Sequence, residues 1–232
     1  MYVNTAAIIN KSVQLLHQIS DTAILCAGVT SYKALKETET KPGQFVAIVG
    51  AAGGLGHLAI QYANAMGMRV IALDFGPKKK QFCYTMGAEF AVDVSESDVL
   101  EQVEEITCGG CHGIVVLATQ PSAFTSAVRM CRSGGTIACV GLPAGTFECP
   151  IVEVALRRLT IRGSIVGTRK DAAEAVDFAS RGLVSCSVEL DKLENINNVF
   201  TRLRNGQIEG RVVLKISDDM ALGTSYVSKS IM

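Results

Sequence analysis

The sequence has no tryptophan, few histidines and prolines, and no surplus of either charge. Lys and Arg number 22, as do Asp and Glu, so no charged surface field indicates nucleic acid or an anionic membrane as a partner. No stretch approaches the roughly 20 apolar residues that span a bilayer. The opening MYVNTAAIINKSVQ lacks a basic leader and a sustained apolar core, so we expect no secretory signal.

Cysteine is comparatively frequent, with eight residues scattered along the chain and several of them in apolar stretches. Such thiols are typical of reduced, buried side chains, so we expect a cytoplasmic protein without a disulfide framework. Cys108 and Cys111 form a C-x-x-C pair in a glycine turn with only His112 beside it. We interpret this pair as a loop rather than a metal or redox site.

Short β-rich runs alternate with amphipathic helical patterns from about Phe45 onward. Continuous apolar runs such as VAIV, VIAL and IVVL are typical of parallel strands covered by helices on both faces. The alternation predicts an α/β fold with a doubly wound, six-stranded sheet in the order 3-2-1-4-5-6. The expected strands are Phe45–Val49, Arg69–Asp74, Glu89–Asp93, Gly113–Leu117, Thr136–Val140 and Thr160–Val166. The expected helices are Leu55–Met66, Lys78–Met86, Ser97–Ile106, Ser122–Arg132 and Val152–Arg157.

The pattern changes after Gly167, where two acidic pairs with a spacing of three resemble capping boxes that open helices. These pairs are Asp171 with Glu174 and Asp191 with Glu194; Gly182 can close the first helix, and the second ends near Gly206. A last strand is expected at Arg211–Ile216, followed by a polar, unpatterned tail.

A glycine-rich turn carries the functional argument. Strand Phe45–Val49 leads directly into GAAGGLG, residues 50–56, and then into a helix. Glycines let backbone N–H groups approach a pyrophosphate, and the helix N-terminus adds partial positive charge. The next strand ends in Asp74, twenty residues past Gly54, where a carboxylate would accept hydrogen bonds from an adenosine ribose. An anion there repels a 2′-phosphate, which favours NAD over NADP, although the lysines at 78–80 weaken that repulsion.

Other interpretations of these residues stay open at this point. A Rossmann-like methyltransferase that binds S-adenosylmethionine would share the local pattern. The glycines alone are compatible with an ordinary tight turn, and Asp74 with a solvated strand end. His57 follows the glycines and could touch a phosphate, but we interpret it as a solvated helix histidine.

Five segments closely resemble the yeast-type, NAD-dependent zinc alcohol dehydrogenases of the medium-chain dehydrogenase/reductase family. They are CAGVTSYKALKE from Cys26, PGQFVAIVGAAGGLGHLAIQYANAMGMRVIALD from Pro42, GLPAGTF from Gly141, GSIVGTRKDAAEAVDFASRGLV from Gly163 and GQIEGRVV from Gly206. The resemblance implies an oxidoreductase that transfers hydride with NAD between a primary or secondary alcohol and its aldehyde or ketone. In this family a zinc ion polarises the substrate oxygen.

The resemblance also implies which residues surround the cofactor. Those on the pyrophosphate side are Gly53, Gly54 and Leu55, with Arg211 paired to a phosphate; those near the adenosine are Asp74 and Lys79; those near the nicotinamide are Val140, Leu142, Ser164 and Val166. Relatives assemble as dimers or tetramers through the coenzyme domain, which implies pairing through Thr160–Val166. The implied division is a leader with the start of the match at 1–26, an NAD-binding domain at 27–167, a remnant of the catalytic domain at 168–217 and a tail at 218–232.

The zinc ligands are where this sequence departs from the family. Relatives begin with a catalytic domain that supplies two catalytic ligands and a four-cysteine zinc loop, whereas residues 1–20 contain no cysteine and one histidine, His17. Cys26 matches the third catalytic ligand, but a catalytic zinc needs three protein ligands. We therefore expect this chain by itself to hold no zinc and to be inactive. The alternatives are a catalytically dead NAD-binding module, which acts by binding or by assembling with intact relatives, and a fragment of a full-length enzyme.

Overall fold

The computed structural model describes residues 23–96 and 98–216. The predicted tail at 218–232 and residues 1–22 of the predicted leader lie outside the described residues. Within the described ranges, no helix is long and apolar enough to cross a membrane.

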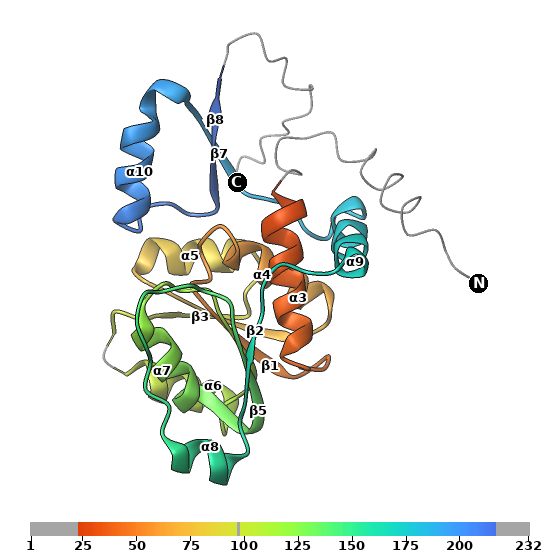
Figure 1. The fold of residues 1–232 in the computed structure, drawn as a ribbon, viewed down its shortest axis with the longest axis vertical. Coiled ribbons are helices and arrows are strands. Elements are labelled where there is room, and N and C mark those ends of the chain that lie inside the picture. The colour runs from red at the N-terminus through yellow and green to blue at the C-terminus, as the bar shows by residue number, and fades with distance from the viewer. Residues whose placement is uncertain (1–22, 97, 217–232) are drawn as a thin grey trace, which may run out of the picture.

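A six-stranded, wholly parallel sheet forms the centre of the molecule (Figure 1). Its order is β3-β2-β1-β4-β5-β6, which confirms the predicted topology and fold class. The strands are β1 (Phe45–Val49), β2 (Arg69–Asp74), β3 (Phe90–Asp93), β4 (Cys111–Val116), β5 (Cys131–Cys139) and β6 (Thr160–Gly163). The strand order reverses between β1 and β4. The switch point, where ligands of such sheets bind, therefore lies between these two strands.

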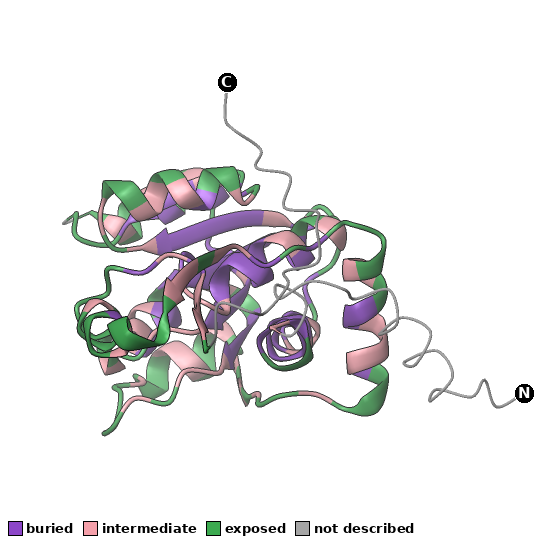
Figure 2. Ribbon diagram, turned by 90° about the horizontal axis from the view of Figure 1, so that it is seen from above, coloured by how far each residue is buried: buried purple, intermediate pink, exposed green. Residues whose placement is uncertain are grey.

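Helices cover both faces of the sheet, because strand side chains alternate between two apolar clusters. Val46 and Ile48 face the first cluster, and Phe45, Ala47 and Val49 face the second. The first is covered by α3 (Val29–Glu37), α4 (Gly56–Ala65), α5 (Pro77–Thr85) and α9 (Arg169–Ser180), and the second by α6 (Val99–Thr107) and α7 (Pro121–Met130). Buried residues gather in the strands and on the inward helix surfaces, as Figure 2 shows.

The remaining elements lie around this sandwich. The short helix α8 (Ile151–Arg157) follows the loop after β5 and has no buried residue. A π-helix, η1 (Ile24–Gly28), precedes α3. At the other end of the chain, β7 (Val188–Lys192), η2 (Leu193–Asn195), α10 (Ile196–Arg204) and β8 (Arg211–Lys215) form a unit around a two-stranded parallel sheet (Figure 1).

Charged side chains join α3 to α9. The Nζ of Lys36 lies 2.8 Å from Asp171 Oδ1 and 2.7 Å from Glu174 Oε2, and the hydroxyl of Tyr32 donates to Glu174 at 2.8 Å. Burial disfavours the charged carboxylate of Asp171, but hydrogen bonds from Lys36 and Thr168 outweigh that effect and hold its pKa far below the usual range. These contacts fix the C-terminal segment on the sheet sandwich.

Several predicted boundaries and caps are wrong. The helix predicted at Ser122–Arg132 ends at Met130, because Cys131 already pairs with Cys111 at the start of β5. The strand predicted to reach Val166 ends at Gly163. Helix α9 is capped by Thr168, whose hydroxyl accepts from the backbone N–H of Asp171, so Glu174 is free to face Lys36.

The second predicted capping box is wrong as well. Asp191 lies inside β7, a strand that we did not predict, and Asn195 precedes α10 without a side-chain cap. By contrast, Gly182 closes α9 with a φ of +74°, as expected of a left-handed terminating residue.

Candidate functional site

The glycine-rich turn, residues 50–56, lies between the carboxyl end of β1 and the start of α4. Gly50 has a φ of +86°, a left-handed conformation that favours glycine. A Cβ atom at Gly56 would overlap the carbonyl oxygen of Gly50, so the helix can begin this close to the strand only without a side chain. The turn therefore brings the N-terminus of α4, with its unpaired N–H groups, to the switch point of the sheet.

Asp74 connects the end of β2 to this turn. Its Oδ2 accepts from the backbone N–H of Ala52 at 2.8 Å, and its Oδ1 accepts from Phe75 N at 2.8 Å and from the Nζ of Lys79 at 3.0 Å. A carboxylate offers about four acceptor positions, so about one remains for a ribose hydroxyl. The structure thus brings Asp74 and Lys79 together at the turn.

Arg211, the first residue of β8, reaches the same turn from the C-terminal segment. A Cβ at Gly54 would lie 2.9 Å from its Nε, and the N–H of Gly210 donates to the carbonyl of Ala52 at 2.9 Å. Among the described residues, the Nε of Arg211 is a buried donor without a hydrogen-bond partner. A buried donor in that state costs free energy unless a ligand supplies the acceptor.

His57 is fully buried in α4, so the prediction of a solvated histidine is wrong. Its Nε2 accepts from the backbone N–H of Ser187 at 3.2 Å, which assigns the ring proton to Nδ1, 2.9 Å from the carbonyl oxygen of Gly53. Burial, with a smaller effect of the nearby Arg211 charge, lowers its pKa to about 4. His57 is a neutral positioning residue that joins the turn to the C-terminal segment, and no local sequence signal identified it.

The residues expected near the nicotinamide follow the last two strands of the large sheet. Val140 follows β5, and Ser164 follows β6, where its backbone N–H donates to Cys139 at 2.9 Å. The hydroxyl of Ser164 is buried without a partner among the described residues. Val166 has a φ of +43°, an uncommon conformation for a β-branched residue that is found at ligand sites. Leu142 is 83% exposed.

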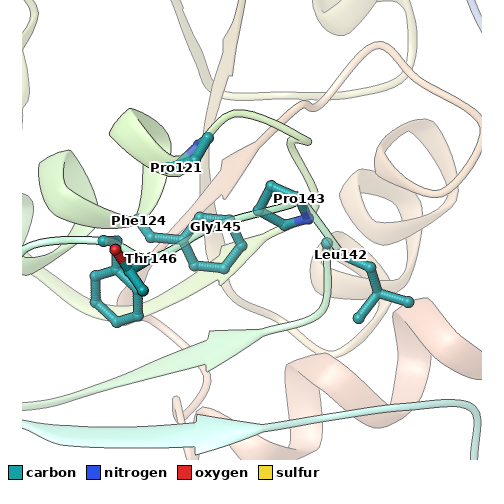
Figure 3. A pocket seen from close by; sticks show the side chains of 8 residues that line it. Pro121, Phe124, Leu142, Pro143, Gly145 and Thr146 are labelled. Carbon is teal, nitrogen blue, oxygen red and sulfur yellow. The ribbon is translucent and has the colours of Figure 1, made fainter.

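An apolar pocket of about 190 Å³ adjoins these residues, between α7 and the loop after β5 (Figure 3). Pro121 and Phe124 supply the helix side, and Phe147 packs on Phe124 with ring centroids 5.6 Å apart. Leu142 also lines the pocket and lies at one end of the group of side chains in Figure 3. The glycine-rich turn, Asp74, Arg211 and the apolar pocket all lie at the carboxyl ends of the parallel strands.

Cys26 lies in η1 with an exposed side chain. Within residues 23–96 and 98–216, no three His, Cys, Asp or Glu side chains gather as a possible metal site. The described residues therefore do not fit a catalytic zinc, which needs three protein ligands. Cys108 and Cys111 form no joint site either, because Cys108 is exposed while Cys111 is buried in β4, where burial raises its pKa to about 12.

Comparison with known proteins identifies the family. The family model of zinc-binding dehydrogenases matches residues 54–181, more than half of the chain. An alcohol dehydrogenase of Rhizobium meliloti is 50% identical over 194 residues, which cover 84% of this chain and 56% of that protein. The chain thus spans a little over half the length of this curated relative.

Solved structures agree with the sequence matches. The alcohol dehydrogenase of Aeropyrum pernix superposes with a TM-score of 0.78 at 33% identity, covering 84% of this chain and 57% of that one. Acetophenone reductase from Geotrichum candidum, solved in complex with NAD, gives a TM-score of 0.72 at 27% identity, covering 85% and 56%. The chain belongs to the zinc-type alcohol dehydrogenase family of oxidoreductases.

Proposed function

We propose that the described residues form the NAD(H)-binding part of a dehydrogenase that transfers hydride between an alcohol and its carbonyl product. The observation that carries the proposal is the buried Nε of Arg211, which faces Gly54 and has no hydrogen-bond partner within the described part of the chain. A pyrophosphate seated over residues 53–55 would supply the missing acceptor, and its charge would be stabilised by the guanidinium and by the N-terminus of α4.

Each end of the cofactor has a counterpart at the same sheet edge. Asp74 keeps an acceptor position for the adenosine ribose, and its charge disfavours a 2′-phosphate. For the nicotinamide end, Ser164 offers a buried hydroxyl that no other described residue hydrogen-bonds, beside Val140 and Val166. The relative solved with NAD supports the choice of cofactor.

Bound NAD would supply the hydride acceptor, and the protein would bind and orient it. We derive no step through zinc, because Cys26 has no companion ligands among the described residues. In this proposal, alcohol activation depends on ligands that the described residues do not include. The chain by itself then acts as an NAD-binding module without dehydrogenase activity. It pairs with a second copy through the outer edge of β6, which has no partner strand among the described residues.

Three measurements on the purified chain test this function together. We expect saturable NADH binding, less than one zinc per chain by elemental analysis, and no NADH absorbance from ethanol and NAD. Stoichiometric zinc with turnover would overturn the part concerning catalysis, and absence of NADH binding would overturn the cofactor assignment. A variant with Cys26→Ser serves as the control, since a zinc-dependent signal would disappear in it whereas NADH binding would not.

A further inference from the structure

A second cavity, of about 240 Å³, opens at the opposite edge of the sheet, where β1, β4 and β5 begin. We call it the amino-edge pocket; its polar lining includes Lys41, Gln44, His112, Arg132 and Ser133. One water molecule occupies about 30 Å³ in the liquid, so the pocket has room for a small polyatomic ligand. The cofactor site lies at the carboxyl ends of the same strands and does not include it.

The charge in the amino-edge pocket is positive and uncompensated. Neither Lys41 nor Arg132 forms an ion pair with any of the described residues. Glu39 lies at the rim, but its Oε1 is 2.7 Å from the Nη2 of Arg162, which balances that carboxylate. Two cations in one concave site favour an anionic ligand.

Among the described residues, the guanidinium of Arg132 has His112 as its only hydrogen-bond partner. The backbone N–H of Phe45 points at the Nδ1 of His112 from 3.2 Å, and the Nη1 of Arg132 lies 2.8 Å from the Nε2 of the same ring. Both neighbours are donors, whereas a neutral imidazole offers one acceptor and one N–H. A guanidinium has five N–H donors, so at least four of those of Arg132 have no acceptor among the described residues.

We propose that the amino-edge pocket binds an oxyanion of the phosphate class, held by the guanidinium of Arg132 and the ammonium of Lys41, with His112 orienting the guanidinium. A tetrahedral oxyanion has enough acceptor oxygens for both cations, and a guanidinium can bind two of them side by side. The source is either free phosphate or the phosphoryl group of a small phosphomonoester.

Calorimetric titration of the full chain with inorganic phosphate, and separately with ribose 5-phosphate, tests the site. We expect one anion per chain, with at least about tenfold weaker binding after Arg132→Gln, because a charge-assisted hydrogen bond is lost. Arg129→Gln is the matched control, since it removes the same charge from an exposed position near the end of α7, three residues earlier. The tighter of the two ligands identifies the source, and binding of either supports the site.

Further variants separate this pocket from the cofactor site. Lys41→Gln, in an exposed loop, should also weaken the anion and keeps the test valid if Arg132→Gln does not fold. Arg211→Gln should leave the anion bound. The proposal is overturned if neither anion binds, if Arg129→Gln weakens binding as much as Arg132→Gln, if Lys41→Gln has no effect, or if only Arg211→Gln abolishes binding.

Discussion

The Nε of Arg211 would lie 2.9 Å from a Cβ atom added at Gly54, although the two residues are far apart in the sequence. The contact brings the first residue of β8 onto the glycine-rich turn, so the C-terminal segment contributes directly to the proposed cofactor site. Gly54→Ala would displace the guanidinium, and Arg211→Gln would remove its charge.

We expect both variants to weaken NADH binding about tenfold to a hundredfold, the equivalent of about 1.5–3 kcal/mol for a hydrogen bond to a charged group. Fluorescence titration with NADH measures the effect. Arg204→Gln is the matched control, because Arg204 is exposed on α10 and outside the site. Unchanged affinity in Arg211→Gln would contradict its role as a phosphate ligand.

The neutral state of His57 makes stability depend on pH. Its pKa is lowered to about 4 in the fold, so the folded chain binds fewer protons than the unfolded chain between that pH and about 6.5. The free energy of unfolding should therefore fall as the pH drops through this window, by an order of magnitude of about 3 kcal/mol. Urea unfolding at several pH values gives the slope.

His57→Gln provides the comparison for that slope. The variant is less stable at neutral pH, but its stability should change less between pH 6.5 and 4 because the group that titrates is gone. His112, whose pKa is also lowered by burial and by Arg132, is present in both proteins, so its contribution to the pH dependence cancels in the comparison. Parallel slopes in the two proteins would show that His57 is not the group responsible.

Lys36 stabilises the packing of α9 on α3. Lys36→Met leaves the buried carboxylate of Asp171 without its ion-pair partner and should lower the free energy of unfolding by about 2 kcal/mol, a value reduced for the partial exposure of Lys36. Lys33→Met, which removes the i,i+4 pair with Glu37 one turn earlier, should cost about 0.5 kcal/mol or less. Equal losses in the two variants would argue against a special role of Asp171.

The same ion pair predicts sensitivity to acid. Because the pKa of Asp171 is lowered in the fold, its stabilisation is complete above the usual pKa of an aspartate, about 3.9, and is lost as the pH falls below it. Thermal melts of wild type and Lys36→Met should therefore converge at low pH. A constant difference between the two melting temperatures would contradict this.

The outer edge of β6 has no partner strand within the described part of the chain. Apolar side chains accompany it, with Ile161 38% exposed on the strand and Ile165 72% exposed just after it. We expect two copies to pair there, and Ile161→Lys to give a monomer by light scattering. Leu203→Lys, at an exposed apolar position on α10, should remain dimeric. A monomeric wild type would contradict the pairing.

The sheet was predictable because its strands are continuous apolar runs and parallel topology constrains their order. β1 and β2 have the predicted bounds. β7 was not predicted, because its sequence VELDK mixes apolar and charged residues and its partner β8 lies beyond α10. A strand that depends on a distant partner has little local signal.

In the candidate site, too, features made by residues close in sequence were predictable, and contacts between residues far apart in sequence were not. The glycine-rich turn and Asp74 follow from spacing along one strand–turn–helix unit. The burial of His57 was missed because the N–H that covers it belongs to Ser187, 130 residues away. The proximity of Lys41, His112 and Arg132 was missed for a similar reason, since parallel strands bring their amino ends together from distant parts of the sequence.

The most direct test of the account is calorimetric titration of wild type and Asp74→Ala with NADH and NADPH. The account predicts that wild type binds NADH about tenfold to a hundredfold more tightly than NADPH, and that Asp74→Ala loses most of this preference, because it loses the ribose acceptor and the charge that repels a 2′-phosphate. Asp177→Asn, at an exposed position on α9, should behave as wild type. Equal affinity of wild type for the two cofactors, or no binding of either, would contradict the central claim.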